Sequence, residues 1–459
     1  MTTKEVIEKL KQGNDIITGQ IIKDLIKDHI PEKNRTKRLY AEYKGDVEVK
    51  NREFDDPNKI NNKLPNDYRG DIIDQITGYL FGEPINYDVD KNEYKESEFK
   101  KVMDELRSFK SRNSIDDLDS TTGEIASICG YAARLLYIDK EGKERVIDVK
   151  PWETIFVFDP TLDEVQYGLI YYDITIVESG KKTTRTKVEF YDKENVHFFI
   201  STKDGDYIRD LNEPENPKKH MFNTVPLVRF DNNNILQGDF EKVDDLIDSY
   251  DRVLSDIQNE VEEFRLAYLA FYGVEPKEEV IRQARRTGAF YFPEGTDGKF
   301  ITKPLDDAVE FVKDHKNTLN ENIYKFSKSI DMRNEKFSGS SISGESRKWQ
   351  LVPLENKAKT KERKFTKALR KQFKILQSVW NKKEIPFDAE KISFQFTRNL
   401  PVDLKYQAET TQILKGNVSE KTRLSLLSFI DDPEKELEQI KSEQGDFIDF
   451  GNNNPQANE

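Results

Sequence analysis

Cysteine and histidine are scarce in this sequence. Cys129 is the single cysteine among 459 residues, so an internal disulfide framework is impossible and a reducing cytoplasm is expected. It lies in the apolar run Ile125–Tyr131, which favours a buried small side chain over a nucleophile. Four histidines lie far apart, with none at the spacing of metal ligands: His29, His197, His220 and His315. We therefore expect no metal, no cofactor and no redox chemistry.

Long apolar runs are missing as well. Residues 1–15 contain no segment of signal-peptide type, and no run approaches the roughly 20 apolar residues of a membrane span. Even the apolar segment Phe264–Val274 is too short and carries Arg265. These absences predict a soluble protein that is made and kept inside a cell, without a membrane partner.

Nucleotide-binding motifs are also absent. No phosphate-binding loop of the form G-x-x-x-x-G-K-[ST] occurs, nor any G-x-G-x-x-G fingerprint, so ATP hydrolysis is not supported. Carboxylate pairs are frequent, but 86 acidic residues in 459 explain them by chance and solubility. No catalytic residue is predicted.

Charge and aromatic content indicate a folded protein with a polar, acidic surface. Lys and Arg number 73 against 86 Asp and Glu, and aromatic residues make up 11% of the chain, too many for a disordered protein. The net charge of -13 means that the protein as a whole does not bind nucleic acid as a basic protein does. Any DNA contact is therefore expected to be local.

Hydrophobic periodicity divides the first half of the chain into helices and strands. Helical spacing predicts two short helices within Thr3–His29, stopped by Pro31, and further helices over Tyr68–Leu80 and about Lys95–Lys110. Between residues 131 and 230, short β-prone runs separated by charged turns replace this spacing. The sequence therefore predicts a β-rich insert in this region.

Two long helices are predicted next. Apolar residues recur every three or four positions from Phe240 to Tyr268 without Pro or Gly, which predicts a helix roughly 50 Å long. A second long helix is expected after Pro304, over Asp306–Asp331. The segment between the two is expected to contain a short helix near Glu278–Arg286 and a hairpin of the strands Ala289–Phe292 and Lys299–Thr302.

The first long helix is strongly acidic, with ten acidic and two basic residues between Gly238 and Glu263. A narrow apolar stripe on such a rod favours packing between neighbouring rods over burial inside a globule. The residues expected to pack subunits together are Val243, Ile247, Tyr250, Leu254, Ile257, Val261 and Phe264.

Small and basic residues dominate the region that follows. Phe337–Ser346 (FSGSSISGES) predicts a flexible loop, and a third long helix is predicted over about Ser346–Trp380 with a kink at Pro353. Eleven basic and three acidic residues lie between Glu345 and Lys374, a local net charge of +8. The chain is then expected to form a strand, two helices and an acidic tail whose last dozen residues are disordered: Ile392–Thr397, Asp403–Leu414, Ser419–Ser428 and the residues from Asp431 onward.

Three long segments resemble one protein family. Tyr68–Tyr87 (YRGDIIDQITGYLFGEPINY), Asp239–Gly273 and Asn356–Phe373 (NKAKTKERKFTKALRKQF) are similar, in this order and spacing, to the SPP1-type portal proteins of tailed phages that infect Gram-positive bacteria. Gly416–Glu443 fits the same family, and the resemblance extends over about Asn14–Glu443. It implies a non-enzymatic subunit of a ring at one capsid vertex, through which double-stranded DNA is packaged and ejected.

The resemblance also implies partners and a division of the chain. The ring usually has twelve subunits and meets the terminase, the head-to-tail adaptor, and the major capsid and scaffolding proteins. The fold class expected is α+β, mainly α. Its implied parts are a wing over 1–238 with the β-rich insert 131–230, stem helices over 239–273 and 306–336, a clip over 274–305, a tunnel loop over 337–346, a kinked tunnel helix and return to the wing over 346–400, a crown over 401–445 and a disordered tail over 446–459.

DNA contact is expected at the loop and the basic helix, because a channel wall rich in Lys and Arg throughout holds DNA instead of letting it slide. We expect the loop to close around the duplex as a clamp or valve, and the basic helix to provide limited phosphate contact. The candidate channel residues are Gly339, Ser340, Ser341, Ile342, Ser343, Gly344, Arg347 and Lys348.

Two alternatives from other classes stay open at this point. A DNA-processing enzyme, such as a terminase-like ATPase or a nuclease, is disfavoured by the missing phosphate-binding loop. A scaffold held together by coiled coils also uses long helices with narrow apolar stripes. A ring with a central hole distinguishes a portal from both.

Overall fold

The structure is a computed structural model, and it combines helices and antiparallel sheets. The prediction of an α+β fold is confirmed at that level. The chain divides into two units, residues 1–398 and 399–459. The structure describes residues 3–12, 16–57, 59–159, 161–162, 164–178, 181–265, 268–272, 277–279, 282, 297–301, 306–332, 349–399, 404–427, 430, 433 and 436–442.

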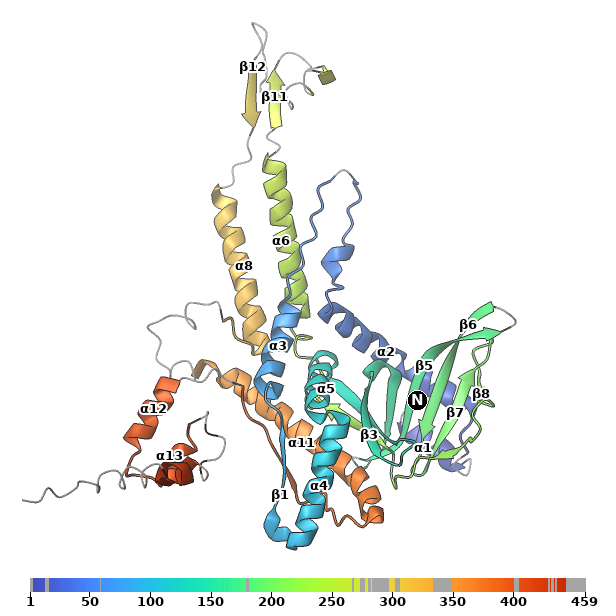
Figure 1. Cartoon of the computed structure of the whole chain (residues 1–459). Helices are drawn as coiled ribbons and strands as arrows, with labels where there is room; N and C mark the ends of the chain where they lie inside the picture. Colours follow the sequence, from blue (N-terminus) through green and yellow to red (C-terminus); the bar gives the residue numbers. More distant parts are fainter. Residues whose placement is uncertain are drawn as a thin grey trace, which may run out of the picture. The chain divides into compact units, whose positions relative to one another are not determined.

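The predicted β-rich insert is confirmed, and it forms two antiparallel sheets (Figure 1). One sheet has the strand order β10–β2–β3, with β2 (Tyr131–Ile138), β3 (Glu144–Val149) and β10 (Leu227–Asp231). The other has six strands, of which β4 to β8 follow sequence order and β9 pairs with β7: β4 (Thr154–Phe158), β5 (Val165–Glu178), β6 (Lys181–Tyr191), β7 (Asn195–Ser201), β8 (Tyr207–Arg209) and β9 (Lys218–Lys219).

Two helices begin the chain, but their boundaries differ from the prediction. α1 covers Thr3–Gln12, and α2 covers Gly19–Tyr43. The prediction that Pro31 stops the helix is wrong, because Pro31 lies inside α2. Ile22 before it and Leu39 after it are both fully buried, so tertiary packing on either side offsets the hydrogen bond that proline cannot make.

The six-stranded sheet is a middle layer with apolar side chains on both faces. Leu169 of β5 packs on one face against α1 and α2. Its neighbour Ile170 packs on the other face against Leu135 and Leu227 of the three-stranded sheet. Successive side chains of a strand point to opposite faces, so one strand contributes to both cores.

Four helices, a two-stranded sheet and the three-stranded sheet contribute to the main core. Phe373 and Trp380 are fully buried there, and Cys129 at the end of α5 is fully buried as predicted. Besides the three-stranded sheet, the core elements are α3 (Tyr68–Phe81) and α4 (Glu96–Asn113), both predicted, α5 (Ile115–Cys129), which was not predicted, α11 (Val352–Trp380), and a sheet of β1 (Asn86–Val89) and β13 (Ile392–Gln395). Short 3-10 helices cover Glu48–Asn51, Lys91–Glu93, Pro151–Glu153 and Asn381–Lys383.

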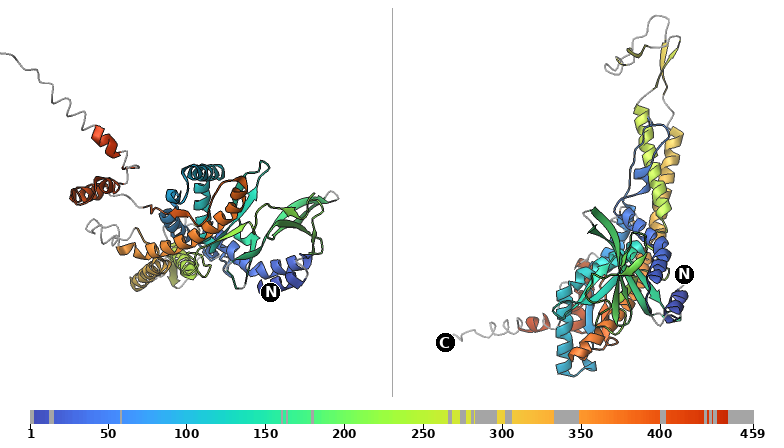
Figure 2. Two further views of the ribbon diagram at one scale, coloured as in Figure 1. Left: turned by 90° about the horizontal axis from the view of Figure 1, so that it is seen from below. Right: turned by 90° about the vertical axis from the view of Figure 1, so that its right-hand side faces the viewer.

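Two long helices run side by side in Figures 1 and 2. α6 covers Asp244–Arg265 and α8 covers Asp306–Ser327. The prediction that the first helix continues to Tyr268 is wrong, because β11 (Tyr268–Tyr272) pairs with β12 (Asp297–Ile301). The predicted strand at Lys299–Thr302 is present over residues 299–301, and it pairs with β11. Ala289–Phe292 lies outside the described residues, and of the predicted helix near Glu278–Arg286 the residues 278, 279 and 282 are helical.

The third long helix begins at the proline that was expected to kink it. α11 starts at Val352, and Pro353 occupies its first turn. A proline is tolerated at this position because its missing N–H has no helical partner there in any case. Residues 349 and 350 are also helical, and a turn at Leu351 separates them from α11, so the described residues agree with a helix interrupted near Pro353. The kink itself stays a prediction.

The second unit contains the helices α12 and α13, and residues 436–442 are helical as well. α12 (Leu404–Ile413) agrees with the prediction, whereas α13 (Glu420–Leu424) is shorter than the expected Ser419–Ser428. Ser419 caps α13 by accepting a hydrogen bond from the Thr422 amide. Across the described part of the whole chain, no helix is both long and apolar enough to cross a membrane.

Candidate functional site

The predicted basic stretch forms most of α11, and the helix separates its cations between two faces. Leu369 and Phe373 lie on the apolar face, which is buried in the main core. Lys357 and Lys361 also point toward the interior. On the opposite, exposed face, cations recur every three or four residues, and we call them the basic ridge: Lys359, Arg363, Lys367, Arg370 and Lys374.

Lys361 is an ammonium group inside the protein. Its side chain is 6% exposed, and its Nζ lies 2.5 Å from Oδ2 of Asp239, the residue that precedes α6 by a few positions. Burial lowers the pKa of Lys361 to about 8, against the opposing attraction of Asp239. Burial by itself raises the pKa of Asp239, but the two ammonium groups of Lys357 and Lys361 outweigh it and the net shift is downward.

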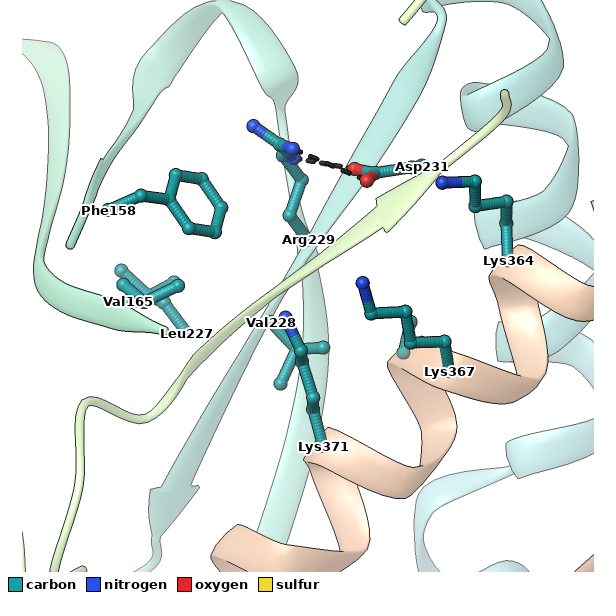
Figure 3. A pocket seen from close by; sticks show the side chains of 10 residues that line it. Phe158, Val165, Leu227, Val228, Arg229, Asp231, Lys364, Lys367 and Lys371 are labelled. Atoms are coloured by element: carbon teal, nitrogen blue, oxygen red, sulfur yellow. Dashed lines mark hydrogen bonds and ion pairs between the residues drawn. The ribbon is translucent and has the colours of Figure 1, made fainter. Parts of the chain in front are cut away.

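A shallow pocket lies beside the ridge, between α11, β10 and β4 (Figure 3). Lys364, Lys367 and Lys371 line it from the helix. From β10, the Arg229 guanidinium lies 4.4 Å from the centre of the Phe158 ring and donates to Asp231 at 2.5 Å. Asp231 therefore balances the charge of Arg229, and the three lysines give this pocket its positive character.

The two chain ends that flank residues 333–348 are held firmly. At the end of α8, the Gln75 side chain accepts from the Ile330 amide and donates to the Ile330 carbonyl, both at 2.9 Å. In the first turn of α11, Glu355 accepts from Arg398 at 2.9 Å and from the Tyr79 hydroxyl at 2.8 Å. These contacts set the positions at which the intervening segment leaves and re-enters the fold.

The predicted channel residues lie in this intervening segment and outside the described residues. They are Gly339, Ser340, Ser341, Ile342, Ser343, Gly344, Arg347 and Lys348. The first described residue after them, Trp349, is 71% exposed.

The predicted packing residues of the first long helix have different environments. Val243 and Ile247 are fully buried within the subunit, next to Ile323 of α8. Val261 is 47% exposed. Tyr250, Leu254 and Ile257 are half-buried, and Phe264 lies in α6 without a described side chain. The residues near the start of the stripe thus belong to the core, and those near its end are accessible in a single subunit.

An extended segment, residues 59–66, runs alongside α6 and contacts its polar face. We call it the strap. The Asn62 amide donates to Asn259 at 2.7 Å, and the Leu64 amide donates to Ser255 at 3.0 Å. Two residues further, the Asn66 amide donates to Asp251 at 2.9 Å. Every second amide of the strap therefore meets every fourth side chain of the helix.

The strap and the Lys361 ion pair escaped prediction from sequence. Periodicity identifies apolar faces, whereas Ser255 and Lys361 are polar residues that are buried because of distant partners. The spacing of Lys357 and Lys361 by four residues places them on one helix face, and this was the available signal. Among the described residues, no group of three or more His, Cys, Asp or Glu side chains is arranged to hold a metal ion.

Comparisons with known proteins agree on one class. The family profile described as "Phage portal protein, SPP1 Gp6-like" matches residues 22–447. The portal protein of Bacillus phage SPP1 is 25% identical over 474 residues, covering 98% of this chain and 90% of the relative. The portal protein of Clostridium phage phiCD119 is 25% identical over 430 residues, covering 89% of this chain and 91% of the relative. The matches include α6, α8 and α11.

Proposed function

Because this chain belongs to the SPP1 Gp6-like family of phage portal proteins, we propose that its copies form a ring at one capsid vertex, the channel for packaging and ejecting double-stranded DNA. The match over residues 22–447 carries the proposal. It favours a structural role over the enzyme and scaffold alternatives. The expected ring has twelve subunits and is located in the virion after assembly in the host cytoplasm.

We infer a division of the chain into the parts of such a subunit. We assign residues 1–238 to the wing, α6 and α8 to the stem, residues 274–305 to the clip, and residues 337–346 to the tunnel loop. α11 is the tunnel helix, and the chain returns to the wing by residue 400. Residues 401–445 form the crown, followed by the tail. The clip contacts the terminase and the head-to-tail adaptor, and the outer parts contact the major capsid and scaffolding proteins.

The accessible part of the α6 stripe supports packing between copies. Leu254 and Ile257 are half-buried and Val261 is exposed in one subunit, and a neighbouring subunit removes such apolar surface from water. A rod with ten acidic residues over Gly238–Glu263 also repels DNA phosphates, which lowers friction in a channel. DNA contact is therefore limited to the tunnel loop and the basic ridge, without sequence specificity.

Assembly tests the proposal directly. Native mass spectrometry and negative-stain microscopy of the purified full chain are expected to find a closed ring with a central hole. A protein that stays monomeric at micromolar concentration contradicts the proposal.

Deleting Ser340–Ser343 tests the role of the tunnel loop. The deletion is expected to leave ring assembly unchanged and to impair DNA packaging or retention, because the duplex loses its clamp. The measurement is the amount of nuclease-protected DNA in filled heads. Packaging at the normal level by rings with the deletion rules out a clamp or valve.

A further inference from the structure

One buried carboxylate lies where the segment before α6 meets α11, close to the end of α8. Asp239 stands just before α6, and α11 supplies two ammonium groups to it. Lys361 Nζ lies 2.5 Å from Asp239 Oδ2, and Lys357 Nζ lies 3.3 Å from Oδ1. Lys357 also donates to the Ser327 carbonyl at the end of α8, at 2.9 Å. We call this cluster the helix joint.

Lys361 has polar partners from three other parts of the chain. Besides Asp239, Lys361 donates to the Ser127 hydroxyl of α5 at 2.7 Å and to the Asn232 side-chain oxygen after β10. Its ammonium group thus has one ionic partner and two hydrogen-bond acceptors. The Asp239 amide in turn donates to the Ser127 carbonyl at 2.8 Å. Partners on three sides restrict the Lys361 side chain to one position and one orientation.

The charge of the joint distinguishes it from an ordinary ion pair. Two lysines share one carboxylate, and the side chains of Lys361 and Asp239 are only 6% and 4% exposed. Apolar residues fill such a site at least as stably, so stability alone does not explain a buried charge cluster. A buried ionic cluster does define the relative position of the elements that contribute to it, because each misplaced charge loses its partner in a low-dielectric environment.

We propose that the helix joint fixes the start of α11 and the end of α8 on the base of α6 as one rigid body, with Lys361 and Asp239 as positioning residues for the channel. The role in the channel rests on the proposed function, whereas the helix joint itself lies within one subunit. Residues 333–348 connect α8 to α11, so the joint determines where both ends of this segment are held.

Hydrogen exchange on the full chain tests the joint without reference to assembly. In Asp239→Asn and in Lys361→Met, amides in the last turn of α8 and in the first three turns of α11 are expected to exchange at least tenfold faster than in the unmodified protein. The acceleration is expected at both helices in each variant. Lys357→Met removes the contact with Ser327 but keeps Lys361 with Asp239. It is expected to accelerate the end of α8 and leave the turn around Lys361 protected. This pattern does not arise from general loss of stability.

Arg112→Met is the matched control. Arg112 binds Glu144 at 2.9 Å and Glu105 at 2.7 Å between α4 and β3, away from the joint. It is expected to lower the melting temperature without the paired change at α8 and α11. Equal acceleration in the control and the joint variants, or unchanged exchange in Asp239→Asn, overturns the proposal. Should Lys361→Met not fold, Asp239→Asn and Lys357→Met still decide the question.

A packaging assay then relates the joint to the channel. Rings of Asp239→Asn that assemble normally are expected to retain at least fivefold less DNA than rings of Arg112→Met with the same melting temperature. Equal retention overturns the positioning role while the exchange result stands. Failure of the unmodified chain to form rings counts against the proposed function and leaves the exchange test of the joint intact.

Discussion

Arg134 shows how a single buried residue organises the main core. Its guanidinium is fully buried and donates to Asp119 at 2.8 Å and to Gln372 of α11 at 3.2 Å. Its centre lies 4.5 Å from the Phe230 ring centre, and Asp148 lies within 3.3 Å of its Nε. A planar cation suits this site, because it satisfies acceptors in its plane and contacts an aromatic face above it.

Replacing Arg134 with Met is expected to destabilise the protein by about 3–5 kcal/mol, since Asp119 is then buried without its cation. Urea unfolding of the isolated subunit measures this loss. Adding Asp119→Asn is expected to restore part of it, because the second change removes the unpaired charge. The control Arg107→Met, an exposed residue 4.0 Å from Asp104, is expected to change stability by less than about 0.5 kcal/mol.

His29 makes the first unit sensitive to acid. It is buried, its Nδ1 lies 2.9 Å from the Tyr171 hydroxyl, and burial lowers the pKa of His29 to about 4 from its ordinary value of 6.5. The unfolded chain therefore binds a proton first as the pH falls, and stability decreases between pH 6.5 and 4. The expected loss by pH 4 is about 3 kcal/mol.

The pH dependence of unfolding in His29→Gln measures this contribution. Gln does not titrate, so the difference in unfolding free energy between pH 7 and pH 4 is expected to be about 3 kcal/mol smaller in the variant. The same pH dependence in both proteins contradicts a buried neutral His29.

At the scale of elements, α6 is stabilised by polar contacts on the face that the strap covers. Ser255 is fully buried, and its hydroxyl accepts from the Leu64 amide. A buried amide without an acceptor is costly. These side chains accept hydrogen bonds from the amides of the strap, as the carbonyl groups of a neighbouring strand do at a sheet edge. The strap therefore keeps its extended conformation beside a helix without forming a sheet.

Ser255→Ala is expected to lower the free energy of unfolding by about 1–3 kcal/mol, because the Leu64 amide loses its partner. Amides of residues 62–66 are expected to exchange faster with solvent. Ser249→Ala is the control on the same helix, where the hydroxyl donates only to the Asp245 carbonyl at 2.7 Å. Equal effects of the two substitutions contradict a specific role of the strap contact.

At the scale of the whole molecule, the distribution of charge is uneven. The net charge is -13, yet the exposed face of α11 carries five cations in succession. Lys357 and Lys361 do not add to this face, because Asp239 binds both of them. The cations available to DNA phosphates are therefore fewer than the composition of the stretch implies.

Neutralising Arg363, Lys367 and Arg370 to Gln is expected to weaken binding of a short duplex to the assembled ring and to make it less salt-dependent. The slope of log K against log salt is expected to fall by roughly 0.9 for each phosphate group that the ring no longer binds. Fluorescence anisotropy at several salt concentrations measures the slope. The control removes three exposed cations of α4, Lys100, Lys101 and Arg107, and an equal change in both variants contradicts a DNA-facing ridge.

Local pattern determined much of this protein from sequence alone. Apolar periodicity located α3, α4, α6, α8 and most strands of the insert, because burial of one face requires a fixed spacing. The acidic and basic character of α6 and α11 also followed directly from composition. Three long segments were sufficient to indicate the portal family before the comparisons confirmed it.

Tertiary structure decided what local pattern leaves open. Pro31 stays helical because packing holds both sides of it, and Tyr268–Tyr272 becomes a strand because β12 supplies its hydrogen bonds. Lys359 and Lys361 are the same residue type two positions apart, yet one is exposed and the other is buried against Asp239. Sequence determines which faces a helix has, whereas the partners that meet each face come from distant parts of the chain.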